Sequence, residues 1–327
     1  MVMRLLFAGT PDVALPSLRL LAGDPEHFQV MAALTRPDAP KGRGRRLEPS
    51  PVKAAALELG IPVIESDPGE ADFIDTLQRT GAEYAAVVAY GKILKRPVLD
   101  AMPGGWYNLH FSLLPQWRGA APVQRAIWSG ETITGATVFR LTPGMDEGPI
   151  LAQSTVEIGA HETSGQLLER LAEDGSHLLG ASLEALAEGR ALPIEQPQGA
   201  YEVARKVTSQ DAHIRFDRPV FAPDRQIRAC TPNPGAWCRI HEDGENGDRI
   251  TQVQVIEAAP AQPGQPGLPG LPEDLKPGRL AMSKKHIWVG TASMPLELLQ
   301  VKAAGKKAMK AIDWARGARL EKDAFCD

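Results

Sequence analysis

The chain has 327 residues, of which 43% are hydrophobic and 23% charged, and its formal net charge is −4. This composition is typical of a soluble globular protein long enough for two domains, and no apolar run approaches the roughly 18 residues that a membrane helix needs. The three cysteines, Cys230, Cys238 and Cys326, form no CxxC or Cys/His metal spacing. We therefore expect no disulfide, no metal and a cytoplasmic protein.

The charge is unevenly distributed along the chain. Residues 1–200 carry a net charge of −7, whereas residues 201–327 carry +3. A basic second half favours a polyanionic partner, although a charge of +3 is small by itself. Local clusters of basic residues are more informative.

Strand and helix patterns alternate through the first half. We predict strands over 3–10, 28–35, 61–66, 83–91, 105–112 and 136–141, and helices over 13–23, 49–61, 71–81, 120–130 and 163–189. The apolar run over 83–91 is typical of a strand buried on both faces. This alternation predicts an α/β fold with an open, Rossmann-like, mostly parallel sheet, whose ligands bind beyond the carboxyl ends of the strands.

The second half has a different pattern. Residues 191–207 contain prolines and are predicted as a linker between a domain over 1–190 and a domain over 208–327. Short strands are predicted over 236–241, 251–258, 286–291 and 296–302, with one helix over 223–230. A small OB-like β-barrel is the expected fold, and the Gly/Pro-rich stretch 259–278 is a surface loop within it.

The first strand ends at Gly9, as it does in dinucleotide-binding folds. No GxGxxG follows it, however, so the glycines that let a backbone approach a pyrophosphate are missing. A nicotinamide cofactor is therefore disfavoured.

Three polar residues form a candidate catalytic group. Asn108 and His110 are two residues apart in a predicted strand, so their side chains point to the same face. Asp146 lies in a turn flanked by Gly144 and Gly148, which allow close approach to a ligand. Taken singly, the pair suits structural hydrogen bonding and the Asp suits an ordinary acidic turn. Their joint occurrence around one helix and one strand favours a site.

The chain resembles the 10-formyltetrahydrofolate-dependent formyltransferases. The resemblance is carried by "NLHFSLLPQWRGAAPVQRAIWSG" at 108–130, "GMDEGPIL" at 144–151, "FAGTPDVALPSL" at 7–18 and "LQVKAAGKKAMKAIDWARG" at 299–317. It implies that Asn108, His110 and Asp146 are catalytic. An amide and a protonated imidazole would donate to the oxyanion of the formyl group. Asp146 would hold the imidazole and accept a proton from an amine that the substrate supplies.

The same resemblance implies the residues that contact the formyl donor, 10-formyltetrahydrofolate. These are Tyr90, Lys92, Ile93 and Leu94 in "AYGKIL", Ser112, Leu113, Leu114 and Pro115 in "SLLP", and Thr142 and Gly144 beside Asp146. No metal is required for this chemistry.

Two basic segments suggest an RNA partner. Residues 36–46 carry five basic residues against one Asp, and their glycines and prolines predict a loop rather than a strand or helix. Residues 302–322 carry seven basic residues against two acidic ones. The expected phosphate contacts are Lys41, Arg43, Arg45, Arg46, Lys206, Lys302, Lys306 and Lys307. Arg43 best matches the family's loop arginine that discriminates between tRNAs, and solvated surface charge is the alternative.

The function expected from the resemblance is transfer of the formyl group to the amino group of methionine attached to initiator tRNA, by a monomer that binds no membrane. Within the same fold, the acceptor could instead be an amino sugar or a glycinamide ribonucleotide. From a different class, the chain could be an RNA-binding module without catalysis. Basic residues in both segments favour tRNA, and the intact catalytic group disfavours a binding module.

Overall fold

The computed structural model describes residues 2–41, 44, 46–244, 247–261, 268, 270–321 and 323–327. It divides into two compact units. Unit 1 consists of Met1–Pro122, Ile133–Glu157 and Leu168–Ala204, and unit 2 consists of Val123–Thr132, Ile158–Leu167 and Arg205–Asp327. Each unit therefore gathers segments that lie far apart in the sequence.

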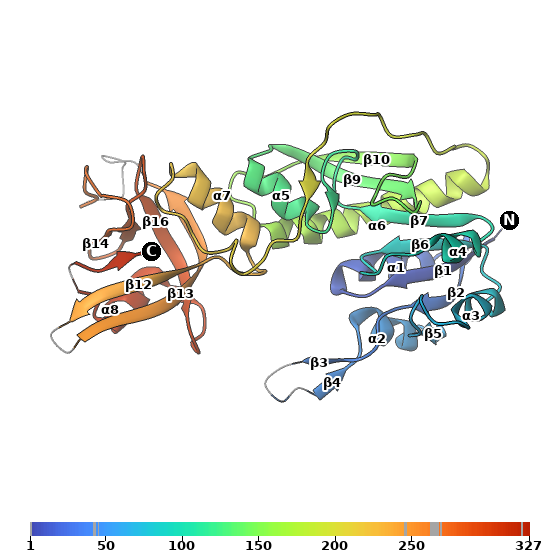
Figure 1. The fold of residues 1–327 in the computed structure, drawn as a ribbon, viewed down its shortest axis with the longest axis horizontal. Coiled ribbons are helices and arrows are strands. Elements are labelled where there is room, and N and C mark those ends of the chain that lie inside the picture. The colour runs from blue at the N-terminus through green and yellow to red at the C-terminus, as the bar shows by residue number, and fades with distance from the viewer. Residues whose placement is uncertain are drawn as a thin grey trace. The chain divides into compact units, whose positions relative to one another are not determined.

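Unit 1 is built on a seven-stranded sheet of order β10-β9-β7-β6-β1-β2-β5 (Figure 1). Five strands are parallel: β1 (Met3–Gly9), β2 (Phe28–Leu34), β5 (Val63–Ile64), β6 (Tyr84–Val88) and β7 (Gly105–His110). Of the remaining two, β9 (Ile133–Arg140) pairs antiparallel with β7, and β10 (Ile150–Glu157) pairs antiparallel with β9. The predicted mostly parallel, Rossmann-like sheet is confirmed, whereas strand β10 was not predicted from the sequence.

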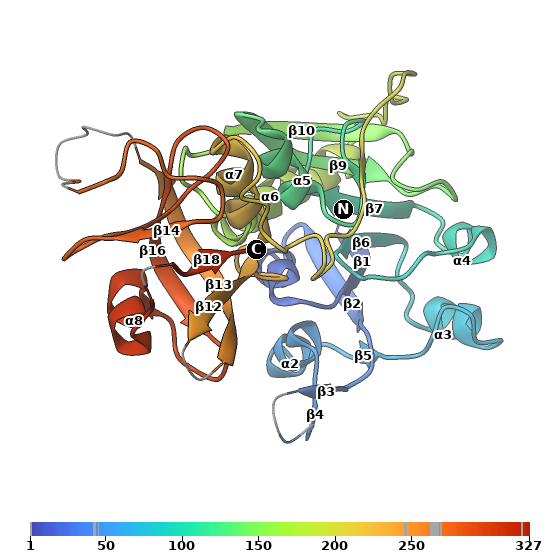
Figure 2. The same ribbon diagram turned by 60° about the vertical axis from the view of Figure 1, so that its left-hand side comes forward.

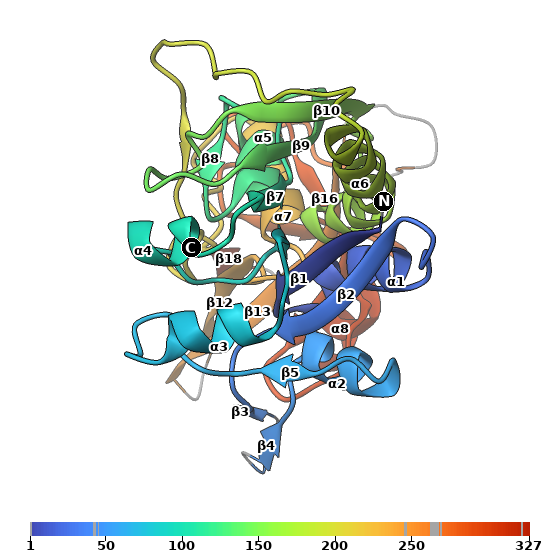
Figure 3. The same cartoon turned by 90° about the vertical axis from the view of Figure 1, so that its right-hand side faces the viewer.

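Helices cover both faces of this sheet. Figure 3 shows α1 (Leu15–Ala22) and α6 (Ser164–Ala187) on one side, with α3 (Phe73–Arg79) and α4 (Arg96–Asp100) on the other. Covering both faces explains the continuous apolar run of β1, in which Leu5 and Phe7 are as fully buried as Leu6. α2 (Pro51–Glu58) packs beside α1.

Two glycines let α6 approach its neighbours closely. A Cβ at Gly175 would lie 3.0 Å from Leu109 of β7, and one at Gly180 would lie 2.8 Å from Leu20 of α1. Side chains at these positions would push the helix away from the strand that carries Asn108 and His110. The small residues therefore help to fix β7 against the helical layer.

Unit 2 contains the second large sheet, with β12 (Trp237–Gly244), β13 (Gly247–Pro260), β14 (Leu280–Met282), β15 (Ile287–Val289), β16 (Leu296–Ala303) and β18 (Phe325–Cys326) in the order β14-β15-β16-β13-β12-β18 (Figure 2). An antiparallel bridge between Arg279 and Phe325, and the Cys326 N–H···O=C bond to Gly278, join the two ends of this sheet. The result is a nearly closed antiparallel barrel, as predicted.

Helices complete unit 2. α7 (Phe221–Cys230), close to the predicted helix, packs beside β13, and α8 (Ala311–Ala318) packs beside β16. α8 was not predicted from the sequence and is only two turns long. Its Trp314 and Ala315 are buried on the barrel, so packing rather than intrinsic propensity holds this short helix.

The basic segment 36–46 departs from the prediction. Ala39–Lys41 (β3) pairs in antiparallel register with Arg46–Glu48 (β4), so the expectation that this segment holds no strand was wrong. Proline lacks a backbone N–H. It is tolerated at position 40 because β3 and β4 form a two-stranded sheet, in which no third strand needs a hydrogen bond from that position. A buried hydrogen bond of 2.7 Å between the hydroxyls of Thr35 and Ser50 ties the two ends of the hairpin together.

In the described parts of the chain, no helix combines the length and apolar character needed to cross a membrane.

Candidate active site

β7 places Asn108 and His110 on one face of the sheet of unit 1. Strand alternation directs both side chains to the face that also carries their cross-strand partners on β9, Phe139 and Thr137. The His110 ring is buried and meets the Phe139 ring edge-on, with centroids 6.3 Å apart. Asn108 is half-buried, and its carboxamide has no hydrogen-bond partner within the described residues.

The orientation of the His110 ring is set by the backbone of the next segment. Nε2 of His110 lies 2.9 Å from the carbonyl oxygen of Trp117. A carbonyl can only accept, so Nε2 carries a hydrogen in this arrangement. The nitrogen left for chemistry is Nδ1, which faces the Asp146 carboxylate with 3.8 Å between Nδ1 and Oδ2.

Asp146 is held in an unusual backbone conformation. Its φ is +53°, in the left-handed region that non-glycine residues seldom adopt. The Gly119 N–H donates to Asp146 Oδ2 at 2.8 Å. Gly148 lets the loop return tightly to β9, because a Cβ there would lie 1.7 Å from the Arg140 carbonyl oxygen. The loop therefore delivers one carboxylate to the imidazole of His110.

This arrangement suits proton transfer and stabilisation of a developing oxyanion. A separation of 3.8 Å is too long for a direct hydrogen bond, so both Nδ1 and the carboxylate keep capacity for a group placed between or beside them. The nearby hydroxyl of Ser112 is buried and donates to the Gln116 carbonyl at 2.7 Å, so it is occupied. The Ser112 hydroxyl is therefore committed to the backbone in this structure.

The loop after β6 presents backbone and one apolar side chain. Ala89 and Gly91 have positive φ values of 50° and 81°. Tyr90 and Leu94 are buried, whereas Ile93 is 84% exposed. Lys92 forms an ion pair with Asp67. Of the residues predicted here, only Ile93 has an exposed apolar side chain. Tyr90 and Leu94 pack into the hydrophobic core and so anchor the loop.

The "SLLP" segment is fixed by a buried polar network. The Thr137 hydroxyl donates to the Ser112 carbonyl at 2.6 Å and accepts from the Leu114 N–H at 3.1 Å. The Gln153 carboxamide donates to the Leu114 carbonyl and to Thr137. The side chains of Ser112 and Leu114 are buried, whereas Leu113 and Pro115 are half-buried. Thr142 and Gly144, in the loop before Asp146, are also half-buried.

Several groups that build the site were not singled out from the sequence. Trp117 and Gly119 act through the backbone, which no side-chain pattern reveals. Gln153 and Thr137 lie on β10 and β9, and Gln196 lies in the stretch predicted as a linker. A buried amide at a position with loop-like composition is visible only once the fold brings its partners together.

The basic residues predicted to contact RNA fall into separate groups. Arg46 is exposed on β4, Lys41 belongs to β3, and Arg43 and Arg45 lie outside the described residues. Lys206 is exposed where the chain enters unit 2. The exposed Lys302, Lys306 and Lys307 gather at the hairpin between β16 and β17 (Met309–Lys310).

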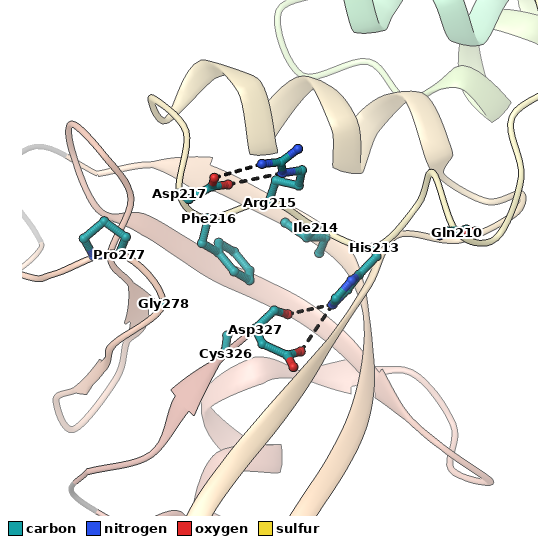
Figure 4. Close-up of a pocket in the computed structure, with 10 residues that line it drawn as sticks. All are labelled: Gln210, His213, Ile214, Arg215, Phe216, Asp217, Pro277, Gly278, Cys326 and Asp327. Atoms are coloured by element: carbon teal, nitrogen blue, oxygen red, sulfur yellow. Dashed lines mark hydrogen bonds and ion pairs between the residues drawn. The ribbon is translucent and has the colours of Figure 1, made fainter.

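A cavity of about 440 Å³ lies in unit 2, and none of the predicted site residues lines it (Figure 4). His213 Nε2 lies 2.8 Å from the Asp327 carbonyl oxygen and 3.3 Å from its Oδ1, and Arg215 pairs with Asp217. These lining groups satisfy one another. Within the described residues, no group of three His, Cys, Asp or Glu side chains is arranged to hold a metal ion.

Known proteins similar to this chain share both units. A family model described as formyl transferase matches residues 3–183, and one described as formyl transferase, C-terminal domain, matches residues 206–319. A methionyl-tRNA formyltransferase of Bifidobacterium adolescentis is 67% identical over 326 residues, 100% of each chain. A protein of the same name from Mycobacterium avium is 47% identical over 322 residues, 98% of each chain.

The fold is shared more widely. The crystal structure of an N-formyltransferase from Helicobacter canadensis, in complex with folinic acid and dTDP-3-aminofucose, is similar with a TM-score of 0.61. The match covers 91% of this chain and 99% of that chain at 17% identity. At this identity the likeness establishes the fold and nothing finer.

Tyr90 gives the site loop a measurable pH dependence. Burial raises the pKa of Tyr90 to about 12, with the positive charge of Arg36 acting in the opposite direction. Because the unfolded phenol ionises near pH 10, the neutral Tyr90 stabilises the fold below about pH 10, and this contribution is lost as the pH rises towards 12. Between these values, wild type should lose up to about 2–3 kcal/mol more unfolding free energy than Tyr90→Phe. Urea denaturation across this range tests it, and parallel curves for the two proteins would contradict it.

Proposed function

Since the chain belongs to the formyl transferase family, we propose that it transfers the formyl group of 10-formyltetrahydrofolate to the free α-amino group of methionine on initiator tRNA. The observation that supports this substrate is the 67% identity, across both units, to a protein named methionyl-tRNA formyltransferase. Because charged tRNA and folate meet in the cytoplasm, the chain acts there, as a monomer.

Alternative acceptors have weaker support. The sugar-linked relative from Helicobacter canadensis shares 17% identity, against 47% for the mycobacterial methionyl-tRNA enzyme. A small-molecule acceptor also leaves the lysines of the β16–β17 hairpin without a partner. A purely RNA-binding module would not need a histidine and a carboxylate arranged face to face.

Asn108 and His110 stabilise the oxyanion in this proposal. The amine nitrogen bonds to the formyl carbon, and the carbonyl oxygen gains negative charge. The free Asn108 carboxamide donates to that oxygen, and so does His110 from Nδ1, since its Nε2 is committed to the Trp117 carbonyl. A carboxylate 3.8 Å away stabilises the positive charge on the ring.

Asp146 moves the proton. The attacking amine becomes positively charged, and the Asp146 carboxylate accepts its proton, directly or through a water. The oxygen then reforms its double bond, the bond between the formyl carbon and the folate nitrogen breaks, and that nitrogen takes up the proton. The Gly119 N–H holds Oδ2 throughout, which leaves Oδ1 free for the transfer.

The folate is assigned to the loops that surround this group. Ile93 supplies an exposed apolar contact, and the loop from Tyr90 to Leu94 supplies backbone groups for a ring rich in donors and acceptors. Leu113 and Pro115 add half-buried apolar surface, and the half-buried Thr142 and Gly144 lie in the loop that leads to Asp146. Ser112 and Leu114, being buried, act through their backbone.

The RNA is assigned to the basic hairpins. Lys41 of β3 and Arg46 of β4 belong to the hairpin of unit 1, and Arg43 and Arg45 lie between them in the sequence, outside the described residues. Lys206, Lys302, Lys306 and Lys307 belong to unit 2. Lysine and arginine on exposed hairpins can follow a phosphate backbone without competing buried contacts.

The function is tested by incubating the protein with 10-formyltetrahydrofolate and methionine-charged initiator tRNA, and by measuring the formyl-methionine formed. We expect rapid transfer to the initiator, and little to charged elongator tRNA or free methionine. Transfer to an amino sugar or a glycinamide ribonucleotide, with none to tRNA, would replace the proposed acceptor. No folate binding would favour the RNA-binding module.

Asn108→Ala should lower turnover rather than binding. One preorganised oxyanion donor contributes about 3 kcal/mol, so kcat should fall about 100-fold or more, while the KM for methionyl-tRNA changes by less than about threefold. Steady-state kinetics under saturating folate measure both. Near-normal kcat would remove Asn108 from the mechanism.

Replacing Lys302, Lys306 and Lys307 by alanine should raise the KM for methionyl-tRNA and make its salt dependence shallower. Each lost phosphate contact removes about 0.7–0.9 from the slope of log K against log salt. The matched control replaces Lys276, Lys284 and Lys285, also exposed in unit 2, and so removes the same charge. Equal losses in both triple variants would show that net charge, not the hairpin, attracts the RNA.

A further inference from the structure

Gln196 is a buried polar residue in the stretch that follows α6. Only 4% of its surface is exposed, although its neighbours Leu192 and Ile194 are 75% and 73% exposed. The stretch passes across β10, where Ile150 and Ile194 exchange backbone hydrogen bonds of 2.7 Å, and ends at β11 (Val203–Ala204) beside β8 (Arg118–Gly119) (Figure 3). Burying a carboxamide is costly unless it is hydrogen-bonded, so the partners of Gln196 indicate its role.

The Gln196 amide nitrogen donates two hydrogen bonds to the loop that carries Asp146. Nε2 donates to the Asp146 carbonyl and to the Gly148 carbonyl, each at 2.8 Å. These two carbonyls bracket Glu147 and follow the residue with φ of +53°. One side chain thus uses both of its donors on the turn that aims the carboxylate at His110.

The Gln196 oxygen is held in turn by Arg118. The Arg118 guanidinium donates to Oε1 from Nε at 3.0 Å and from its terminal nitrogen at 2.6 Å, and its other nitrogen lies 3.8 Å from Glu147. The next residue, Gly119, donates to Asp146 Oδ2. The backbone and the side chain of Asp146 are therefore anchored to adjacent residues of one segment, the backbone through Gln196.

We propose that Gln196 is a positioning residue for Asp146. This role rests on the proposed function in one respect, namely that the Asp146 carboxylate takes part in formyl transfer. Gln196 does not face the substrate. It holds the Asp146–Gly148 turn in a left-handed conformation, which non-glycine residues adopt seldom, so that the carboxylate stays within reach of His110 Nδ1.

The test replaces Gln196 by glutamate, which keeps its size and its pairing with Arg118 but removes both donors to the turn. We expect Gln196→Glu to lower kcat about tenfold to a hundredfold, with the KM for folate and for methionyl-tRNA changed by less than about threefold. Gln196→Met, which removes the donors without adding charge, should act in the same direction. A kcat within about twofold of wild type in both variants overturns the proposal.

A second background separates positioning from general stability. In Asp146→Asn, the added Gln196→Glu change should lower the residual kcat by less than about twofold. The carboxylate that Gln196 positions is already absent in this background, so its position no longer affects turnover. An equal loss in both backgrounds overturns the proposal.

Gln226 is a matched control in unit 2. It is also 4% exposed, its Nε2 donates to the Asp211 and His213 carbonyls at 2.8 and 2.7 Å, and its Oε1 accepts from the Arg215 N–H at 3.1 Å. Gln226→Glu should change kcat by less than about threefold. A kcat loss equal to that of Gln196→Glu would assign the effect to the loss of any buried amide.

Hydrogen exchange of the Gly119 amide gives a readout that needs no substrate. If Gln196 holds Asp146 in place, this amide should exchange about tenfold faster in Gln196→Glu and unchanged in Gln226→Glu. Unchanged exchange in Gln196→Glu overturns the positioning. Failure of wild type to formylate methionyl-tRNA would overturn the proposed function and leave the exchange result to decide the positioning.

Discussion

Two backbone groups of one short segment control the candidate site. The Trp117 carbonyl accepts from His110 Nε2, and the Gly119 N–H donates to the Asp146 carboxylate. Backbone groups can hold these side chains only if the segment itself is fixed, and its pairing with β11 fixes it. Gly119 has φ of +116°, and a Cβ there would lie 2.9 Å from the Ala204 carbonyl oxygen, so the close pairing requires glycine.

This constraint determines the chemistry that remains possible. With Nε2 committed, His110 can act only through Nδ1, which faces a carboxylate at a distance that leaves both groups available. A buried imidazole beside a carboxylate can carry positive charge where a charged group would otherwise be costly. In the proposed mechanism, the site therefore stabilises negative charge on the substrate and accepts a proton, and the substrate supplies the nucleophile.

The sequence predicted those parts of the molecule whose signal is local. Apolar runs predicted the buried strands, and alternation along 105–112 placed Asn108 and His110 on one face. Contacts between distant residues gave no such signal: Arg118 and Gln196, which bond directly, are 78 residues apart. α8 and β10 were missed for a related reason, since each is held by tertiary contacts rather than by a long periodic pattern. The β3–β4 hairpin was not predicted because its prolines and glycines indicate a loop. Its two strands pair over only three residues each, too few to give a periodic pattern.

The stretch predicted as a linker shows why composition alone was insufficient. Prolines, glutamines and an absence of periodicity indicate a loop, and most side chains there are indeed exposed. Its backbone nevertheless bridges to the edge strand β10 at one residue pair, Ile194 and Ile150, and then pairs with β8. Because the same stretch carries Gln196, the protection of a sheet edge and the placement of the Asp146 turn are joined in one segment. The candidate site is consequently assembled from four separated stretches of unit 1, and substitutions remote in sequence from His110 can alter it without touching the fold's core.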